Sequence, residues 1–403
     1  MNPITPAAWC AALFAAATLF SHTVALRLIL LFAGSALAAA AWLRARSQSS
    51  QAVVFVPPLL LPFGLWAAWA ALSLSWTLDP KITLKELQNE VGYAFLAYWM
   101  CFVGAQAPGA GRILLGTGAL GALALCAIAL VSFVAAPFGP LANLYGGPGA
   151  FASTLLVLFP TTLAAAWYAM RRKWRAPLIG LAIVLLALNV LAGYVAQTRI
   201  FWFALAAQIT LFALLRLLAP PGPVPRPRGS KLFVAALAAL LFASAAALSL
   251  KIQVDRFHAA PGEIANDTRL ALWHSVLGRI AERPLTGIGF GRGIVRHELR
   301  QETGVPYFWH SHNLFLDTAL QLGWPGLALL LVLFGWTAGL AWRLTRSASD
   351  LAFACGLALL PLVAGTMIRN MTDVLWVRQS ALLYWAAVGI LLGLGLRAAK
   401  SSQ

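Results

Sequence analysis

Apolar runs close to 20 residues long recur through this sequence and leave few kinds of fold open to it. A helix of about 20 apolar residues crosses the hydrocarbon core of a bilayer and satisfies its own backbone hydrogen bonds there. Only 10% of the residues are charged and 61% are apolar, far from the composition of a water-soluble domain. The sequence therefore predicts an all-α polytopic membrane protein. The twelve predicted spans lie near residues 5–21, 24–42, 53–75, 91–107, 113–136, 150–170, 177–195, 200–218, 232–250, 325–342, 351–368 and 376–396.

Lysine and arginine residues are distributed unevenly between the loops, and short loops rich in them stay in the cytoplasm. Fifteen basic residues lie in the loops and tail on one side, whereas four lie in the short loops on the other side. We therefore expect both termini in the cytoplasm and the segment 251–322 on the outer face. Most of the net charge of +17 is this topological bias, so it does not indicate a nucleic-acid partner.

One sizeable hydrophilic insertion divides the chain into three parts. Residues 1–250 are expected to hold nine spans, 251–324 a large helical outer loop with the active-site helices, and 325–403 three spans and a cytoplasmic tail.

Helical periodicity is visible inside the outer loop and just before the fourth predicted span. The pattern predicts a loop helix from about 267 to 283, which ends before a proline. We expect a second short helix at 294–303 and a third at 312–322. The segment 79–90 has apolar residues among charges, which suits a short helix at the outer membrane interface.

Titratable side chains collect on the predicted outer side. All six histidines and eleven of the twelve carboxylates map there or to its rim, which leaves Asp350 alone inside. The chain has no GxxxxGK[ST] phosphate loop and no paired Asp-x-Asp for a metal-bound nucleotide, so we expect no cytoplasmic nucleotide donor. The four cysteines lie inside predicted spans, where free cysteine behaves as a small apolar residue.

The densest group of such side chains lies between Tyr307 and Leu316. His310 and His312 are two residues apart, so on a helix their rings would diverge, whereas a zinc pair more often uses a spacing of four. We therefore expect no metal here. A histidine at the start of a short helix, held by a neighbour such as Asn313, suits a general base. A structural histidine at the membrane interface stays open as the alternative.

Three arginines form the second half of a possible site. Arg199 closes the outer end of one span, Arg269 lies in the first turn of the predicted loop helix, and Arg292 follows a glycine-rich break. A guanidinium at a membrane rim can be purely structural. It is also the natural clamp for a diphosphate, through bidentate charge-assisted hydrogen bonds. Several arginines that converge on one histidine would suit departure of a phosphate-linked leaving group.

At these residues the sequence resembles a known family. His312-Asn313, nine further residues and then Gly323-Trp-Pro-Gly326 reproduce the H[NSQ]-x9-G-x-x-[GTY] signature of the O-antigen ligases. Gln197-Thr-Arg199 is similar to the arginine element of that family, and Arg269 is similar to its loop arginine. The resemblance covers roughly residues 190–330 by motif and most of the chain by architecture.

The resemblance implies a glycosyltransferase C-type fold in the bacterial inner membrane, with a periplasmic active site. It implies an undecaprenyl-diphosphate-linked polysaccharide as donor, lipid A-core as acceptor and an inverting transfer with no metal or other cofactor. In that scheme His312 takes the proton from the acceptor hydroxyl, a role worth about 10²–10⁴-fold in rate. The residues expected to bind the diphosphate are Arg199, Arg269 and Arg292, and those with supporting roles are His310, Asn313, Gly323 and Gly326.

Three other functions stay open. An O-antigen polymerase would use the same donor but a second lipid-linked chain as acceptor, and it tends to have two large outer loops. A protein O-oligosaccharyltransferase shares the histidine motif but usually has a longer carboxy-terminal portion. A transporter would place ionisable residues in the middle of broken spans, whereas the spans here are clean apart from Arg27.

Overall fold

The computed structural model describes residues 5–47, 54, 56–135, 147–218, 230–257, 268–305, 308–374 and 379–402. Within these ranges the chain forms helices and no strand, which confirms the predicted all-α class. Nine helices of the described part are long and apolar enough to cross a membrane, so this is a multi-pass membrane protein. They are α2 (Val24–Ser47), α6 (Ala110–Ala135), α8 (Pro148–Arg171), α9 (Ala176–Val195), α10 (Arg199–Leu218), α11 (Ser230–Phe257), α14 (Leu314–Leu344), α15 (Asp350–Arg369) and α16 (Gln379–Lys400).

The other three predicted spans coincide with shorter helices, α1 (Thr5–Ala17), α3 (Leu60–Leu72) and α5 (Tyr93–Ala105). Each predicted apolar run thus carries a helix. Because these three are shorter than a bilayer needs, the total of twelve spans stays a prediction, as does the glycosyltransferase C-type arrangement.

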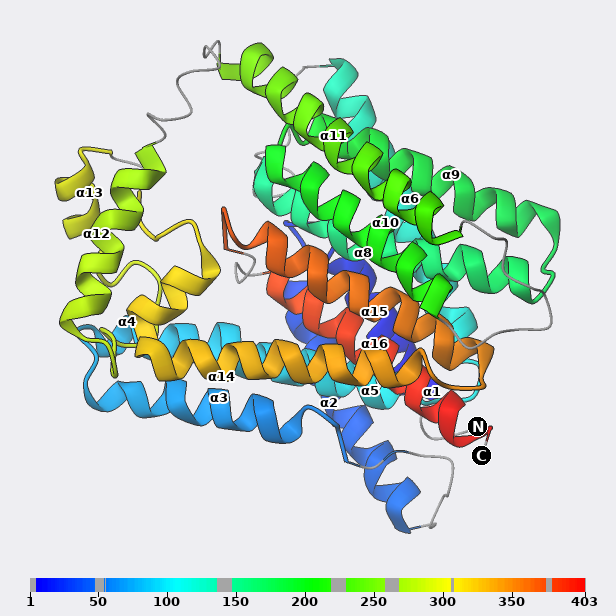
Figure 1. Cartoon of the computed structure of the whole chain (residues 1–403). Helices are drawn as coiled ribbons and strands as arrows, with labels where there is room; N and C mark the ends of the chain where they lie inside the picture. Colours follow the sequence, from blue (N-terminus) through cyan, green and yellow to red (C-terminus); the bar gives the residue numbers. More distant parts are fainter. Residues whose placement is uncertain are drawn as a thin grey trace.

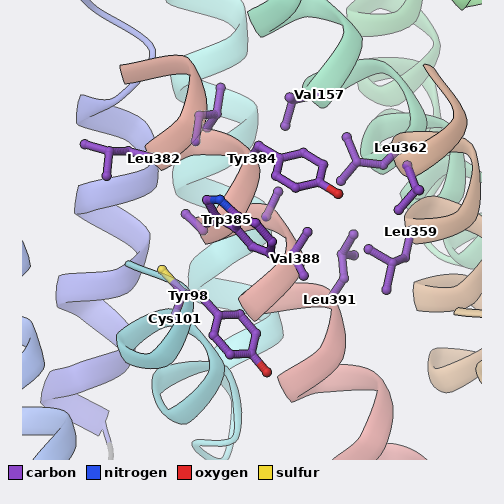
Figure 2. Close-up of a cluster of buried hydrophobic side chains, with 14 of the residues drawn as sticks. Tyr98, Cys101, Val157, Leu359, Leu362, Leu382, Tyr384, Trp385, Val388 and Leu391 are labelled. Carbon is purple, nitrogen blue, oxygen red and sulfur yellow. The ribbon is translucent and has the colours of Figure 1, made fainter. Parts of the chain in front are cut away.

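The core of the bundle lies around α16, which packs along α5 on one side and α15 on the other. Figure 2 shows Tyr384 and Trp385 of α16 between Tyr98 of α5 and the leucine side chains of α15. The α5 and α16 backbones approach closely, because a Cβ at Gly389 would lie 2.3 Å from the Tyr98 carbonyl oxygen. Small residues allow such contact between membrane helices, where dispersion rather than water exclusion drives packing.

The outer loop forms its own small unit. Two of its predicted helices are present as α12 (Thr268–Glu282) and α13 (Arg296–Thr303), and residue 267, where the first was predicted to begin, lies outside the described residues. Buried apolar side chains of these helices, of the segments between them and α14, and of the start of α14 form a second core, separate from that of the bundle. Its members are Leu272, Val276, Ile280, Ile288, Val295, Leu299, Phe308, Ala319 and Leu320.

The helix α14 is broken at Gly323, which has φ 67° and ψ −177°. The break separates a loop helix that ends at Leu322 from a membrane helix, as the sequence predicted. It leaves carbonyl groups of the last turn without partners inside the helix. Those of Leu320 and Gln321 accept hydrogen bonds from the backbone of the glycine-rich segment 287–291, and that of Leu322 accepts one from the Trp69 indole.

The segment predicted as a short interfacial helix does not stand apart from the next span. Helix α4 (Pro80–Glu86), capped by the Asp79 side chain, continues through the π-helix η2 (Leu87–Gly92) into α5. The backbone stays helical through η2. The carboxylates just before α5 therefore belong to the same continuous helical segment.

The two ends of the bundle differ as the charge pattern predicted. Figure 1 shows α12, α13 and α4 at one end and the end of α16 at the other. Asp350 lies 3.5 Å from Arg171 and 3.8 Å from Arg172, so the carboxylate predicted to lie inside is at the end with the basic loops. The orientation of these ends in the cell stays a prediction.

We predict that Gly323→Ala destabilises the junction between the loop and α14. The backbone angles at Gly323 are almost restricted to glycine, and an added Cβ would lie 2.5 Å from the Leu285 carbonyl group. The expected loss is about 1–3 kcal/mol, measured as a lower midpoint of thermal unfolding in detergent. Gly335→Ala in the same helix is the control, because its Cβ meets nothing within 4 Å. Equal midpoints for the two variants would contradict the account.

Candidate active site

The turn before α14 holds the two histidines. Asn313 caps the helix, with its side-chain oxygen accepting from the backbone N–H of Phe315 at 2.9 Å and of Leu316 at 3.1 Å. Its amide nitrogen donates to the Met371 carbonyl at 3.0 Å, which ties the turn to the loop after α15. These bonds fix the backbone next to His312. That Asn313 orients the His312 ring stays a prediction.

The rings of His310 and His312 lie together, with centroids 4.0 Å apart. The prediction that they diverge is wrong because they precede the helix rather than lie on it. His312 has φ 51°, a left-handed conformation, and its backbone N–H donates to Nδ1 of His310 at 2.9 Å. His310 is 4% exposed, and burial lowers its pKa to about 4, although the nearby Asp317 acts in the opposite direction. The neutral ring can therefore accept this hydrogen bond at neutral pH.

The same turn is anchored to both α14 and α12. Asp317, in the first turn of α14, is 2% exposed and accepts from the Ser311 backbone N–H at 2.9 Å. The Trp273 indole of α12 donates to the Ser311 carbonyl at 2.9 Å. The backbone of the residue between the histidines is thus held on both sides, which restricts the positions that the rings can take.

The structure adds Asp373 and Arg369, which sequence reasoning missed. Nδ1 of His312 lies 3.7 Å from Oδ1 of Asp373, longer than a formed hydrogen bond but within reach of a small ring movement. Arg369 is 4% exposed and donates to Oδ2 of Asp373 at 2.7 Å and to the Gly149 carbonyl at 3.1 Å. The group therefore joins the turn before α14 to the ends of α15 and α8.

Asp373 is held as a carboxylate. Burial by itself would raise its pKa, but the adjacent Arg369 charge, the neighbouring His312 and the backbone N–H of Val374 hold the pKa well below its usual range. A permanent carboxylate beside Nδ1 favours the tautomer that carries its proton there. Nε2 of His312 is buried and has no hydrogen-bond partner within the described part of the chain. This nitrogen is then the one able to accept a proton.

A metal ion is the other chemistry to weigh. Ligand atoms of His310, His312 and Asp373 lie within 4.8 Å of one another, a spacing that an ion could bridge. However, Nδ1 of His310 and both oxygens of Asp373 already accept hydrogen bonds, and the Arg369 cation lies against the same carboxylate. Because a divalent cation would have to displace or tolerate that charge, the arrangement favours proton transfer.

The predicted arginines lie in different surroundings. Arg292 is buried and forms ion pairs with Glu90 and, at 3.8 Å, with Glu86. Its charge acts on His310, together with those of Asp317, His312 and Asp373. Arg199 is the first residue of α10, and Arg269 is the second residue of α12. Neither is among the charges that act on His310 in the described structure.

The fold and the site define a class. This is a multi-pass membrane protein with a histidine–carboxylate group at the point where the loop that carries α12 and α13 enters a membrane helix. The O-antigen ligase family model matches residues 181–331, which run from α9 into the second half of α14. This similarity over residues 181–331 supports a ligase- or polymerase-type function in O-antigen synthesis. No curated protein matches the chain.

The matched segment contains every site residue predicted from the sequence, but not the two added by the structure. Arg369 and Asp373 lie beyond its end. A signal for them was present, since an arginine and an aspartate four residues apart at the outer end of a span can form an ion pair. Because they lie far from His312 along the chain, the sequence did not indicate that Asp373 would lie beside its ring.

We predict that His310 makes the folded protein less stable as the pH falls from 6.5 to about 4. Its folded pKa of about 4 lies below the ordinary 6.5, so between these values the unfolded chain binds a proton that the folded chain does not. Stability should therefore decrease as the pH falls through this window, by at most about 3 kcal/mol. His310→Asn keeps an acceptor near the Nδ1 position but does not titrate, so its unfolding midpoint should depend less on pH. Identical pH dependence in the two proteins would contradict this assignment.

Proposed function

We propose that this protein is an O-antigen ligase that transfers polysaccharide from undecaprenyl diphosphate to a sugar hydroxyl of lipid A-core. The reaction takes place on the periplasmic face of the bacterial inner membrane, with both termini cytoplasmic, and uses neither metal nor nucleotide. The observation that carries the proposal is His312, whose Nδ1 faces Asp373 and whose buried Nε2 has no partner within the described residues. The family match and the position of this pair at the entrance of α14 support it.

His312 acts as the general base. Its Nε2 takes the proton of the acceptor hydroxyl while the oxygen forms a bond to the anomeric carbon of the donor. Asp373 holds the imidazole in the required tautomer and stabilises the imidazolium that forms. Arg369 keeps Asp373 ionised and in place through the ion pair at 2.7 Å. The proton is then held in a buried network with a compensating negative charge.

The leaving group departs on the opposite face of the sugar. The bond between the anomeric carbon and the phosphate oxygen breaks, and undecaprenyl diphosphate leaves with the electron pair, so one displacement inverts the anomeric centre. Arg199 and Arg269 neutralise the negative charge that grows on the diphosphate. Arg292 is already paired with carboxylates, so we assign it to support of the histidines instead.

The direct test combines purified protein, lipid-linked polysaccharide and lipid A-core, with EDTA present and no nucleotide. We expect a ladder of conjugates on a gel, because the chemistry needs only the two lipid substrates. Lengthening of the donor chain without conjugate would make the protein a polymerase and contradict the proposed acceptor. Movement of the donor across the membrane without any product would point to a transporter.

The same assay tests the diphosphate clamp through Arg269→Lys. Lysine keeps the charge but loses the planar fork, so we expect turnover to fall about tenfold or more. Arg279→Lys in the same helix is the matched control, since Arg279 pairs with the half-exposed Glu302 on α13. Wild-type turnover in Arg269→Lys would mean that this arginine is structural.

A further inference from the structure

A second group of charges lies next to the histidine pair and comes from a different part of the chain. Glu90 belongs to the π-helix η2, is 7% exposed and forms an ion pair with Arg292, whose side chain is 6% exposed. Glu86, one turn earlier, lies 3.8 Å from the same guanidinium. Two carboxylates of the chain leading into α5 thus hold one arginine of the outer loop.

The burial of this pair is costly in itself. Moving two charges out of water costs several kcal/mol of free energy per ion. The attraction between the two ions often only offsets this cost. Ionisable groups buried at the edge of a membrane bundle therefore contribute little to folding stability and commonly have a functional role. A π-helix inside a longer helix is also frequent at functional sites.

The backbone just before Arg292 is fixed as well. The N–H of Gly291 donates to the Gln321 side chain at 2.9 Å, and the N–H of Phe290 donates to the Ser73 hydroxyl at 3.0 Å. The ion pair of Arg292 adds a link between η2 and the end of the glycine-rich segment.

This end of the glycine-rich segment lies near the residue before His310. A Cβ added at Gly293 would lie 3.8 Å from the Trp309 ring, and the Trp309 and His310 ring centroids are 4.4 Å apart. His310 in turn accepts the backbone N–H of His312. The charge of Arg292 also acts on His310 directly. Arg292 therefore connects Glu90 with the turn that carries the candidate general base.

We propose that Glu90 and Arg292 are positioning residues, which keep the glycine-rich segment against Trp309 and His310 so that His312 retains its left-handed backbone and faces Asp373. The inference rests on the proposed function only for the role of His312 as the base. Neither residue touches substrate in this scheme, and both act through His310. Loss of the pair should therefore slow the chemical step and leave the binding of donor and acceptor unchanged.

The test separates positioning from stability by removing one charge and then both. In Glu90→Gln the buried Arg292 loses its closest partner, so both the unfolding midpoint and kcat should fall, kcat about ten- to a hundredfold with KM for both lipids within about twofold. In Glu90→Gln with Arg292→Gln the unbalanced charge is gone, so the midpoint should recover while kcat stays low. Glu302→Gln, which breaks the ion pair with Arg279 in the same loop, is the control and should leave kcat unchanged.

A readout without turnover keeps this inference distinct from the proposed function. His310 should react slowly with diethyl pyrocarbonate in the wild type and in Glu302→Gln, and several times faster in Glu90→Gln and in the double variant, as followed by mass spectrometry. Recovery of kcat together with the midpoint in the double variant would show that the pair is only structural and would overturn the proposal. Unchanged reactivity of His310 would also overturn it, even if the transfer reaction proves to be a polymerisation.

Discussion

The broken end of a helix at the rim of the membrane bundle determines most of the arrangement described above. The carbonyls of Leu320, Gln321 and Leu322 precede the break at Gly323 and must find partners outside their own helix. Away from water such groups are expensive to leave unpaired. Their partners come from the glycine-rich segment of the outer loop and from Trp69 of α3, and these bonds fix the start of α14 against the bundle.

Because the start of α14 is fixed, the turn that precedes it has a defined place. Asn313 caps the helix, His310 accepts the His312 N–H, and Asp373 faces the His312 ring from the loop after α15. Each contact comes from a different direction, so the backbone that carries the imidazole is held before any substrate binds. General-base catalysis benefits from such preorganisation, because the reaction is slower when a mobile ring must first be ordered.

Local patterns predicted the local structure well, and distant pairings were beyond them. The apolar runs, the start of a helix near His312 and the break at Gly323 follow from residue types at short spacing. The meeting of His310 and His312 depends on a positive φ at a histidine, which a spacing of two does not indicate. Asp373 and the partners of Arg292 come from segments far along the chain, so only the packing of helices brings them to the site.

The most direct measurement is chemical rescue of His312→Ala in the purified transfer reaction. The variant should fold and insert normally, form almost no conjugate, and regain part of its activity when imidazole is added, in a saturable manner. Such rescue would place the missing proton acceptor in the space of the deleted ring beside Asp373. Full transfer by His312→Ala without imidazole would contradict the central claim that this histidine is the base.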